Sequence, residues 1–272
     1  MQATTVSTPA VRSIDQVAKW FHMIWPPVLT FLVAIALWEG AVWLFEIPIY
    51  LLPAPSQIMA TFLERPWFLL GIGMVTFSNA LMGSAIGCSL GVLVAIFCVR
   101  WTFVADGLVP LAIAASAVPI IALSPLMGIW LGSVSAASKI GVIAVMTFFP
   151  TLVSVYAGLI SPRADALLLM RSYAAPQRAV FLKLRMPAAL PFLFNALRVC
   201  ATLSMIGAVV AEFFGGPRNA LGVYIKTQAG ILRTREAWSA IMVACLYGLI
   251  FYLVIVLIER WVMPWKQRHS GQ

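Results

Sequence analysis

Long apolar segments alternate with short polar ones along most of this chain of 272 residues. About 20 consecutive apolar residues are enough for a helix to cross the roughly 30 Å hydrocarbon layer of a membrane. The chain offers six candidate segments, at residues 28–45, 74–99, 104–123, 137–159, 192–213 and 238–262. The pattern predicts an all-α fold, a polytopic membrane protein with about six transmembrane helices.

The polar stretches at the two ends set the predicted boundaries of one membrane domain. We expect residues 1–27 to form a cytoplasmic tail with an interfacial segment, residues 28–262 the transmembrane domain, and residues 263–272 a second cytoplasmic tail. After the first span, two prolines and a serine precede Gln57, and they predict a loop followed by a short amphipathic helix from Gln57 to Leu63.

Glycines and prolines indicate how two of the spans pack. In the second span, glycines recur at every fourth position from Gly83 to Gly91, a spacing that lets helix backbones approach closely in lipid. In and beside the third span, Pro110, Pro119 and Pro125 remove backbone donors that only protein neighbours or a water-lined path can replace. We therefore expect the third span to be buried within the bundle.

The composition excludes an ordinary soluble protein, because 62% of the residues are hydrophobic and only 10% are charged. Soluble domains carry roughly 25% charged residues. A net charge of +9 is also found in nucleic-acid-binding proteins, but basic loops beside apolar spans are the ordinary signature of membrane orientation. We expect membrane lipid, and no nucleic acid, to surround this chain.

Basic residues concentrate on one side of the predicted topology. Six spans place both termini and alternate loops on the same side, which carries eleven Lys and Arg residues against five on the other, with Lys139 and Arg198 at membrane boundaries. The positive-inside rule then predicts that both termini face the cytoplasm. The eleven are Arg12, Lys19, Arg100, Arg163, Arg171, Arg178, Lys183, Arg185, Arg260, Lys266 and Arg268.

The sequence offers little material for catalysis or metal binding. Its two histidines, His22 and His269, lie near opposite ends, and its four cysteines fall in or beside apolar runs without CxxC spacing, as small buried residues do. Residues 132–140 resemble a phosphate-binding loop, but Ser138 replaces its second glycine and Ile140 its Ser/Thr. We expect no catalytic residue, no metal site and no cofactor on this chain.

Charges within the spans are few and lie near the predicted span ends, where snorkelling lowers their cost. They are chiefly Asp106, Lys139, Arg198 and Glu212. These charges leave two function classes open, an ion-coupled secondary transporter and a membrane-embedded enzyme.

The longest basic loop, residues 162–191, contains two helix-compatible stretches. Asp165 to Tyr173 suits one short helix, and Pro176 suits the first turn of a second. On the second helix, Phe181 and Leu184 are expected to form an apolar ridge between basic residues. The loop fits either a docking element for another protein or a solvated segment that sets the topology.

This loop resembles the cytoplasmic coupling loop of ATP-binding-cassette (ABC) importer permeases. That pattern is EAA, three residues, Gly, nine residues and Ile-x-Leu-Pro, and here it ends on Leu184–Pro187. The front half departs from it, since residues 168–170 are Leu, Leu and Met and Ala174 occupies the glycine position. A left-handed turn is disfavoured for alanine at that position.

Other segments resemble the nitrate, sulfonate and taurine branch of these importers. Within that branch, MRSYAA from Met170 and AEFFGG from Ala211 are most similar to permeases for thiamine-precursor pyrimidines or riboflavin. The segments, in chain order, are WEGAVWLFEIPIYLLPAPSQI from Trp38, SKIGVIAVMTFFPTLVSVYAGL from Ser138, IGAVVAEFFGG from Ile206 and ERWVMPW from Glu259.

The resemblance implies a permease subunit in a bacterial plasma (inner) membrane. It implies a second permease copy in a homodimer, two cytoplasmic ATP-binding subunits that bind the ATP, and an extracytoplasmic substrate-binding protein. A pyrimidine thiamine precursor or a riboflavin-like compound is the favoured substrate, with sulfonate, taurine and nitrate left open.

The resemblance also assigns residues to roles. Ser116, Pro119, Ser124 and Glu212 are candidates for the translocation pathway, with helix capping, kink packing and interfacial solvation as alternative roles. The residues implied for coupling to the ATPase are Arg171, Ser172, Tyr173, Ala174, Ala175, Gln177, Arg178, Phe181, Lys183, Leu184 and Pro187.

Overall fold

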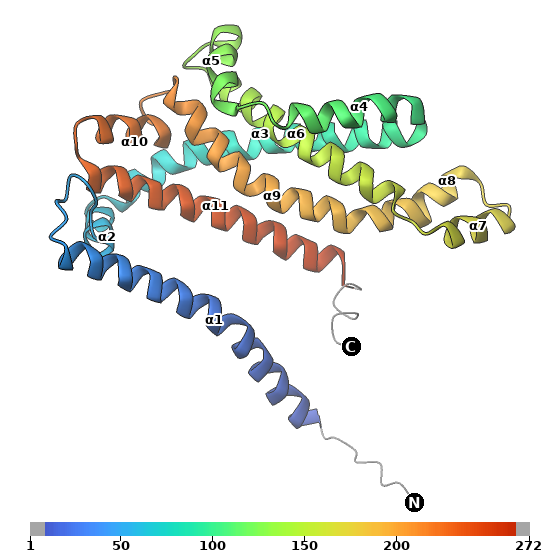
Figure 1. The fold of residues 1–272 in the computed structure, drawn as a ribbon, viewed down its shortest axis with the longest axis horizontal. Coiled ribbons are helices and arrows are strands. Elements are labelled where there is room, and N and C mark those ends of the chain that lie inside the picture. Colours follow the sequence, from blue (N-terminus) through green and yellow to red (C-terminus); the bar gives the residue numbers. More distant parts are fainter. Residues whose placement is uncertain (1–8, 265–272) are drawn as a thin grey trace, which may run out of the picture.

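A computed structural model describes residues 9–264, and within them the side chains of residues 25–119 and 122–264. This part of the chain is all-helical, as predicted (Figure 1). Its five helices long and apolar enough to span a membrane are α1 (Pro9–Leu44), α3 (Pro66–Arg100), α6 (Ala136–Ile160), α9 (Met186–Phe213) and α11 (Thr234–Val262). The shorter helices are α2 (Pro55–Glu64), α4 (Thr102–Ala115), α5 (Ile120–Leu131), α7 (Ala164–Ser172), α8 (Gln177–Val180) and α10 (Leu221–Gly230).

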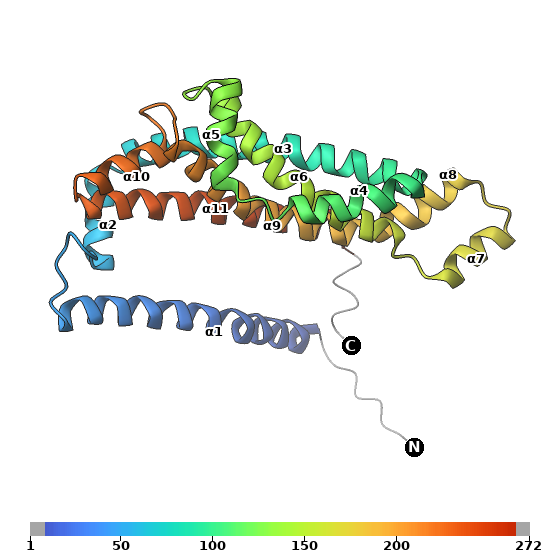
Figure 2. The same ribbon diagram turned by 45° about the horizontal axis from the view of Figure 1, so that its top comes forward.

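The centre of the bundle is formed by α3, α6 and α9, which make the most extensive helix contacts, with α11 beside α9. Figure 2 shows α1 lying apart from these helices. Its links run through α2 and through Trp38, whose ring lies 5.1 Å from that of Trp238 on α11. The Glu39 carboxylate accepts hydrogen bonds from the backbone N–H and the hydroxyl of Ser56, so α1 caps the start of α2. The predicted helix from 57 to 63 is confirmed as α2.

Glycines allow α3 to approach α6, as their spacing predicts. A Cβ at Gly83 would lie 2.6 Å from Ile143, and one at Gly87 would lie 2.2 Å from the carbonyl oxygen of Ala144. Only a residue without a side chain fits such a contact, because the neighbouring atom belongs to a helix backbone.

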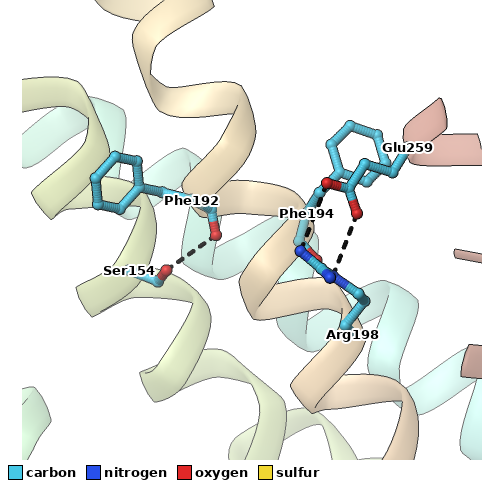
Figure 3. Close-up of polar contacts among 5 residues, drawn as sticks. All are labelled: Ser154, Phe192, Phe194, Arg198 and Glu259. Carbon is cyan, nitrogen blue, oxygen red and sulfur yellow. Dashed lines mark hydrogen bonds and ion pairs between the residues drawn. The ribbon is translucent and has the colours of Figure 1, made fainter. Parts of the chain in front are cut away.

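Polar contacts join α9 to its neighbours near the α7–α8 end of the bundle (Figure 3). Arg198 Nε lies 3.2 Å from Glu259 Oε2, which ties α9 to α11 through a half-buried cation and a buried carboxylate. On the other side of α9, the Ser154 hydroxyl of α6 donates to the Phe192 carbonyl over 2.9 Å. The helix carrying the long basic loop is therefore fastened to both α6 and α11.

The predicted third span, residues 104–123, is not one helix. It is interrupted after Ala115, and the chain resumes as α5 at Ile120. Pro119 explains the break, because a proline disfavours helical backbone at the residue before it and has no N–H to donate. The α4–α5 pair takes the place of the sixth span (Figure 1).

The expectation that this span is buried is also wrong for the single chain. Ala105 and Ala112 are the buried residues of α4, whereas Leu111 and Ile113 are exposed, as are Ile129 and Trp130 on α5. The two alanines touch α3 and α6, and the larger apolar residues face away from them.

The N-terminal helix crosses a predicted boundary. Helix α1 runs without interruption through Pro26 and Pro27, so it includes both the described part of the predicted tail and the predicted first span. Residues 1–8 and 265–272, which contain His269 and most of the predicted C-terminal tail, lie outside the described residues.

We predict that Gly87→Ala lowers the stability of the protein by about 1–3 kcal/mol, the usual cost of overpacking a tight core. The added methyl group would meet a backbone carbonyl and the Thr147 hydroxyl at 2.2 Å, and neither moves without shifting α6. Gly71→Ala on the same helix is the matched control, because nothing lies within 4 Å of its added Cβ. The midpoint of thermal unfolding in detergent should fall for Gly87→Ala only; equal midpoints would show that α3 and α6 are not in this contact.

Candidate functional site

Most of the predicted site residues lie at two opposite ends of the bundle. The C-terminus of α6 and the N-terminus of α9 flank the α7–α8 segment, which projects beyond the other helices (Figure 1). The N-terminus of α6 and the C-terminus of α9 lie at the other end, together with α10 (Figure 1). We call these the coupling end and the cavity end.

At the coupling end, α7 finishes in a Schellman motif. The N–H of Ala174 donates to the carbonyl of Arg171 over 2.9 Å, and the N–H of Ala175 donates to that of Met170 over 3.0 Å. This pattern requires a left-handed residue at the first of the two donors, and Ala174 has φ of +48°. Alanine thus adopts the turn that glycine provides in the pattern the loop resembles, at a cost of roughly 1–2 kcal/mol.

Large apolar side chains on α7 and its turn are exposed. Leu168, Leu169 and Tyr173 are 59%, 57% and 76% exposed. None of the residues of α7 is buried. The predicted coupling residues around this surface that are also exposed are Arg171, Ser172, Ala174, Gln177, Arg178, Lys183 and Pro187.

The predicted second helix of the loop is not separate from the spans. After α8, a π-helical turn over residues 181–185 leads directly into α9, and the Met186 N–H donates to the Phe181 carbonyl five residues earlier. This wide turn precedes Pro187, which cannot donate to the carbonyl four residues before it in a regular α-helix. The result is one helical run from Gln177 to Phe213.

The Phe181 side chain does not form an exposed ridge. It is half-buried and packs against a cluster that includes Ala95 of α3, Leu152 and Leu159 of α6, and Ala189 of α9. Leu184 is also partly buried. Within the loop, most of the exposed large apolar side chains therefore belong to α7 and its turn, which the helical spacing of Phe181 and Leu184 did not indicate.

The four pathway candidates do not come together. Ser116 and Pro119 are exposed at the break between α4 and α5, where the Ser116 hydroxyl donates to the Ala112 carbonyl within its own helix. Ser124 is buried, and its hydroxyl donates over 3.3 Å to the carbonyl of Ala211, the neighbour of Glu212. The structure thus brings Ser124 and Glu212 together at the cavity end.

Glu212 caps a neighbouring helix. It is 1% exposed, and its Oε2 accepts hydrogen bonds from the Gly222 N–H over 2.8 Å and the Thr76 hydroxyl over 2.9 Å. The Thr76 oxygen in turn accepts from the Leu221 N–H over 2.9 Å. These are the first N–H groups of α10, whose N-cap residue, Ala220, has no side chain that can accept them. Thr76 was not identified from the sequence, because nothing local marks a cap supplied by another helix.

A cavity of about 380 Å³ lies between α5, the start of α6 and the end of α9. Ser124, Ser133, Ser138 and Lys139 provide its polar walls, and Ala211 and Gly215 lie beside them. The sequence placed Lys139 at a membrane boundary, where a long side chain would reach water. Instead the residue is 2% exposed, which its position at the start of an apolar span did not reveal.

Lys139 is held by short-range polar contacts. Its ammonium group donates to the Ser133 carbonyl and, over 3.0 Å, to the Ser138 hydroxyl. Gly215 brings the α9–α10 connection against the same loop, since a Cβ there would lie 2.8 Å from the Ser133 carbonyl oxygen. Residues from three separate parts of the sequence therefore meet at this cavity.

The cysteines form no disulfide among the described residues. Cys88, Cys98 and Cys200 are buried, as predicted, whereas Cys245 is exposed. Thr151 Oγ1 lies 3.4 Å from the sulfur atoms of both Cys88 and Cys200, so these thiols pack at the junction of α3, α6 and α9. They act as small core residues at this position.

Comparison with known proteins places these features in a family. Residues 87–268 match the family described as binding-protein-dependent transport system inner membrane component. The formylaminopyrimidine transport permease protein ThiX of Halalkalibacterium halodurans is 29% identical over 89% of this chain and 96% of its own. The riboflavin transport system permease protein RibX of Chloroflexus aurantiacus is 27% identical over 95% and 97%. A putative aliphatic sulfonates transport permease protein, SsuC of Bacillus subtilis, is 27% identical over 88% and 87%.

A solved structure shares the fold. A chain of the MetNI methionine ABC transporter, in an inward-facing conformation, matches this chain with a TM-score of 0.53 and 19% sequence identity. The match covers 72% of this chain and 93% of the MetNI chain. The family match covers more than half of the chain and includes the coupling loop and the cavity residues. This chain therefore belongs to the family of inner membrane components of binding-protein-dependent transport systems, and it is a multi-pass permease of the ABC importer type.

Proposed function

We propose that this permease forms the translocation pathway for a small organic nutrient as part of a larger complex. The other members are a second copy of the chain, two separate ATP-binding subunits and an extracytoplasmic binding protein. The chain itself binds no ATP and carries out no catalysis. The favoured nutrient is a pyrimidine precursor of thiamine or a riboflavin-like compound, since two relatives are named for formylaminopyrimidine and riboflavin.

The observation that carries this proposal is the shape of the coupling end. Helix α7 projects beyond the bundle and exposes Leu168, Leu169 and Tyr173 (Figures 1 and 2). Exposed apolar side chains in the polar environment outside a membrane mark a contact with another protein. We assign this surface to contact with the ATP-binding subunit. We propose that Phe181 transfers the movement of that subunit to α3, α6 and α9.

The second permease copy has support from the outer surface of α4 and α5. Their exposed apolar residues would be covered by lipid or by protein, and the break at residues 116–119 leaves backbone groups that lipid cannot satisfy. A homodimer whose interface covers residues 116–119 would surround these backbone groups with protein instead of lipid. Ser116 and Pro119 would then lie near the interface, where the pathway runs.

The complete complex in proteoliposomes provides the test of function. We expect ATP-dependent uptake of formylaminopyrimidine or riboflavin, with no competition by taurine. Strong uptake of nitrate or taurine, unaffected by pyrimidines or flavins, would overturn the substrate assignment. In the same assay, Tyr173→Ala should abolish uptake and weaken binding of the ATP-binding subunit about 30-fold, the equivalent of losing an aromatic anchor of about 2 kcal/mol.

The matched control for Tyr173→Ala is Phe103→Ala. Phe103 is 90% exposed, against 76% for Tyr173; it lies in the first turn of α4 at the coupling end, outside the loop. Its replacement should leave both uptake and subunit binding unchanged. If the two variants behave alike in a binding titration with the purified ATP-binding subunit, α7 is not the docking surface.

The strained turn at Ala174 gives a second prediction. Ala174→Gly should slow amide hydrogen exchange across residues 170–176 by about fivefold, because it removes roughly 1 kcal/mol of strain from the folded turn. Ala175→Gly is the control, since Ala175 does not have positive φ and gains only flexibility. Exchange at residue 174 that is unchanged, or faster, in the Ala174→Gly protein would argue against the left-handed turn.

Both termini are proposed to face the cytoplasm. The N-terminal end of α1 and the C-terminal end of α11 both point toward the coupling end (Figure 1). In a background with exposed Cys245 replaced by serine, a cysteine at Ser270 should not react with an impermeant thiol reagent added outside intact cells. A cysteine at Arg218, on the exposed α9–α10 connection, should react. Labelling in the reverse pattern would invert the topology.

A further inference from the structure

We propose that the cavity beside Lys139 is a transit subsite for the imported molecule, and that it holds a polar ring compound with a hydrogen-bond acceptor. This inference rests on the proposed function. It adds a site and a recognition chemistry, in which Lys139 donates to an acceptor atom of the ligand.

The cavity has the properties of a ligand site. Its volume of about 380 Å³ is within the range that suits small molecules. Ser124, Ser133 and Ser138 supply polar atoms, while Ile129 and Phe214 supply apolar wall on which a ring can pack. It lies at the end of α6 and α9 opposite α7, where a molecule delivered from outside the cell would first meet the spans.

Lys139 is too costly to be an incidental neighbour of this cavity. A nearly fully buried ammonium group within a membrane-spanning helix is expensive unless it is paired or used. An ammonium group has three donors, and the contacts among the described residues, to Ser133 and Ser138, account for two of them. The third is available to an acceptor in the cavity.

Glu212 lies beside this cavity without lining it. Its Oε2 caps α10. It lines a neighbouring cavity of about 500 Å³, which shares Phe214 and Gly215 with the first. The two cavities therefore adjoin at these two residues.

The test uses the complete complex in proteoliposomes, with radiolabelled formylaminopyrimidine as the probe. Lys139→Met should reduce uptake at least about tenfold, the factor expected for one hydrogen bond to a charged group. Hydrolysis of ATP stimulated by the loaded binding protein should stay within about twofold of the unmodified complex. Arg218→Met is the control, because Arg218 is an exposed cation on the α9–α10 connection and lines neither cavity.

Two results would overturn the subsite. Uptake by the Lys139→Met complex that matches Arg218→Met would show that the lysine is not used. A parallel loss of uptake, stimulated ATP hydrolysis and thermal stability would show a purely structural role. Failure of the unmodified complex to import either formylaminopyrimidine or riboflavin, with ATP hydrolysis still stimulated, would instead contradict the proposed function, and with it the ligand class.

Thiol labelling tests the location independently of transport rates. With Cys245 replaced by serine, Ser124→Cys lies on the cavity wall and Ser116→Cys on the exposed α4–α5 break. During ATP turnover, formylaminopyrimidine should slow labelling of Ser124→Cys several-fold and leave Ser116→Cys unaffected. Equal protection at both positions, or protection at neither, would contradict a subsite at this cavity.

Discussion

Close contact between the backbones of α3, α6 and α9 is the constraint on which the rest of this permease depends. Apolar helices gain little hydrophobic free energy when they associate in lipid. Van der Waals contact between their backbones therefore has to supply the free energy of packing. Gly87 removes the side chain between α3 and α6, and Gly158 does so between α6 and α9, where a Cβ would lie 2.8 Å from Phe192. Both functional ends are formed from the ends of these helices.

Caps supplied by spanning helices explain how two outer helices are attached. The first N–H groups of a short helix need partners, and neither α2 nor α10 begins with a residue whose side chain caps it. Glu39 on α1 supplies a carboxylate to α2, and Glu212 on α9 supplies one to α10. Each carboxylate fixes a peripheral helix to a spanning helix, which makes Glu212 both a structural cap and a wall of the cavity region.

The sequence predicted the features that follow from local pattern. Apolar length predicted the spans other than the third, and the glycine spacing from Gly83 predicted the contact with α6. The break at Pro119 was missed because the apolar run continues through it. The burial of Lys139 was missed because it depends on the end of α9 and on Gly215, which are distant in the sequence. Phe181 shows the same limit, since helical spacing fixes its angle on α9 and not which neighbour fills that side.

One continuous helical run connects the two ends. Residues 177–213 begin at the coupling loop, pass through the π-helical turn and end at Glu212. Phe181 is wedged against α3 and α6 near the start of this run, and the Arg198–Glu259 pair fastens its middle to α11. The proposed coupling therefore has a direct structural route, because the backbone hydrogen bonds of one helical run connect α8 to the residues beside the cavity.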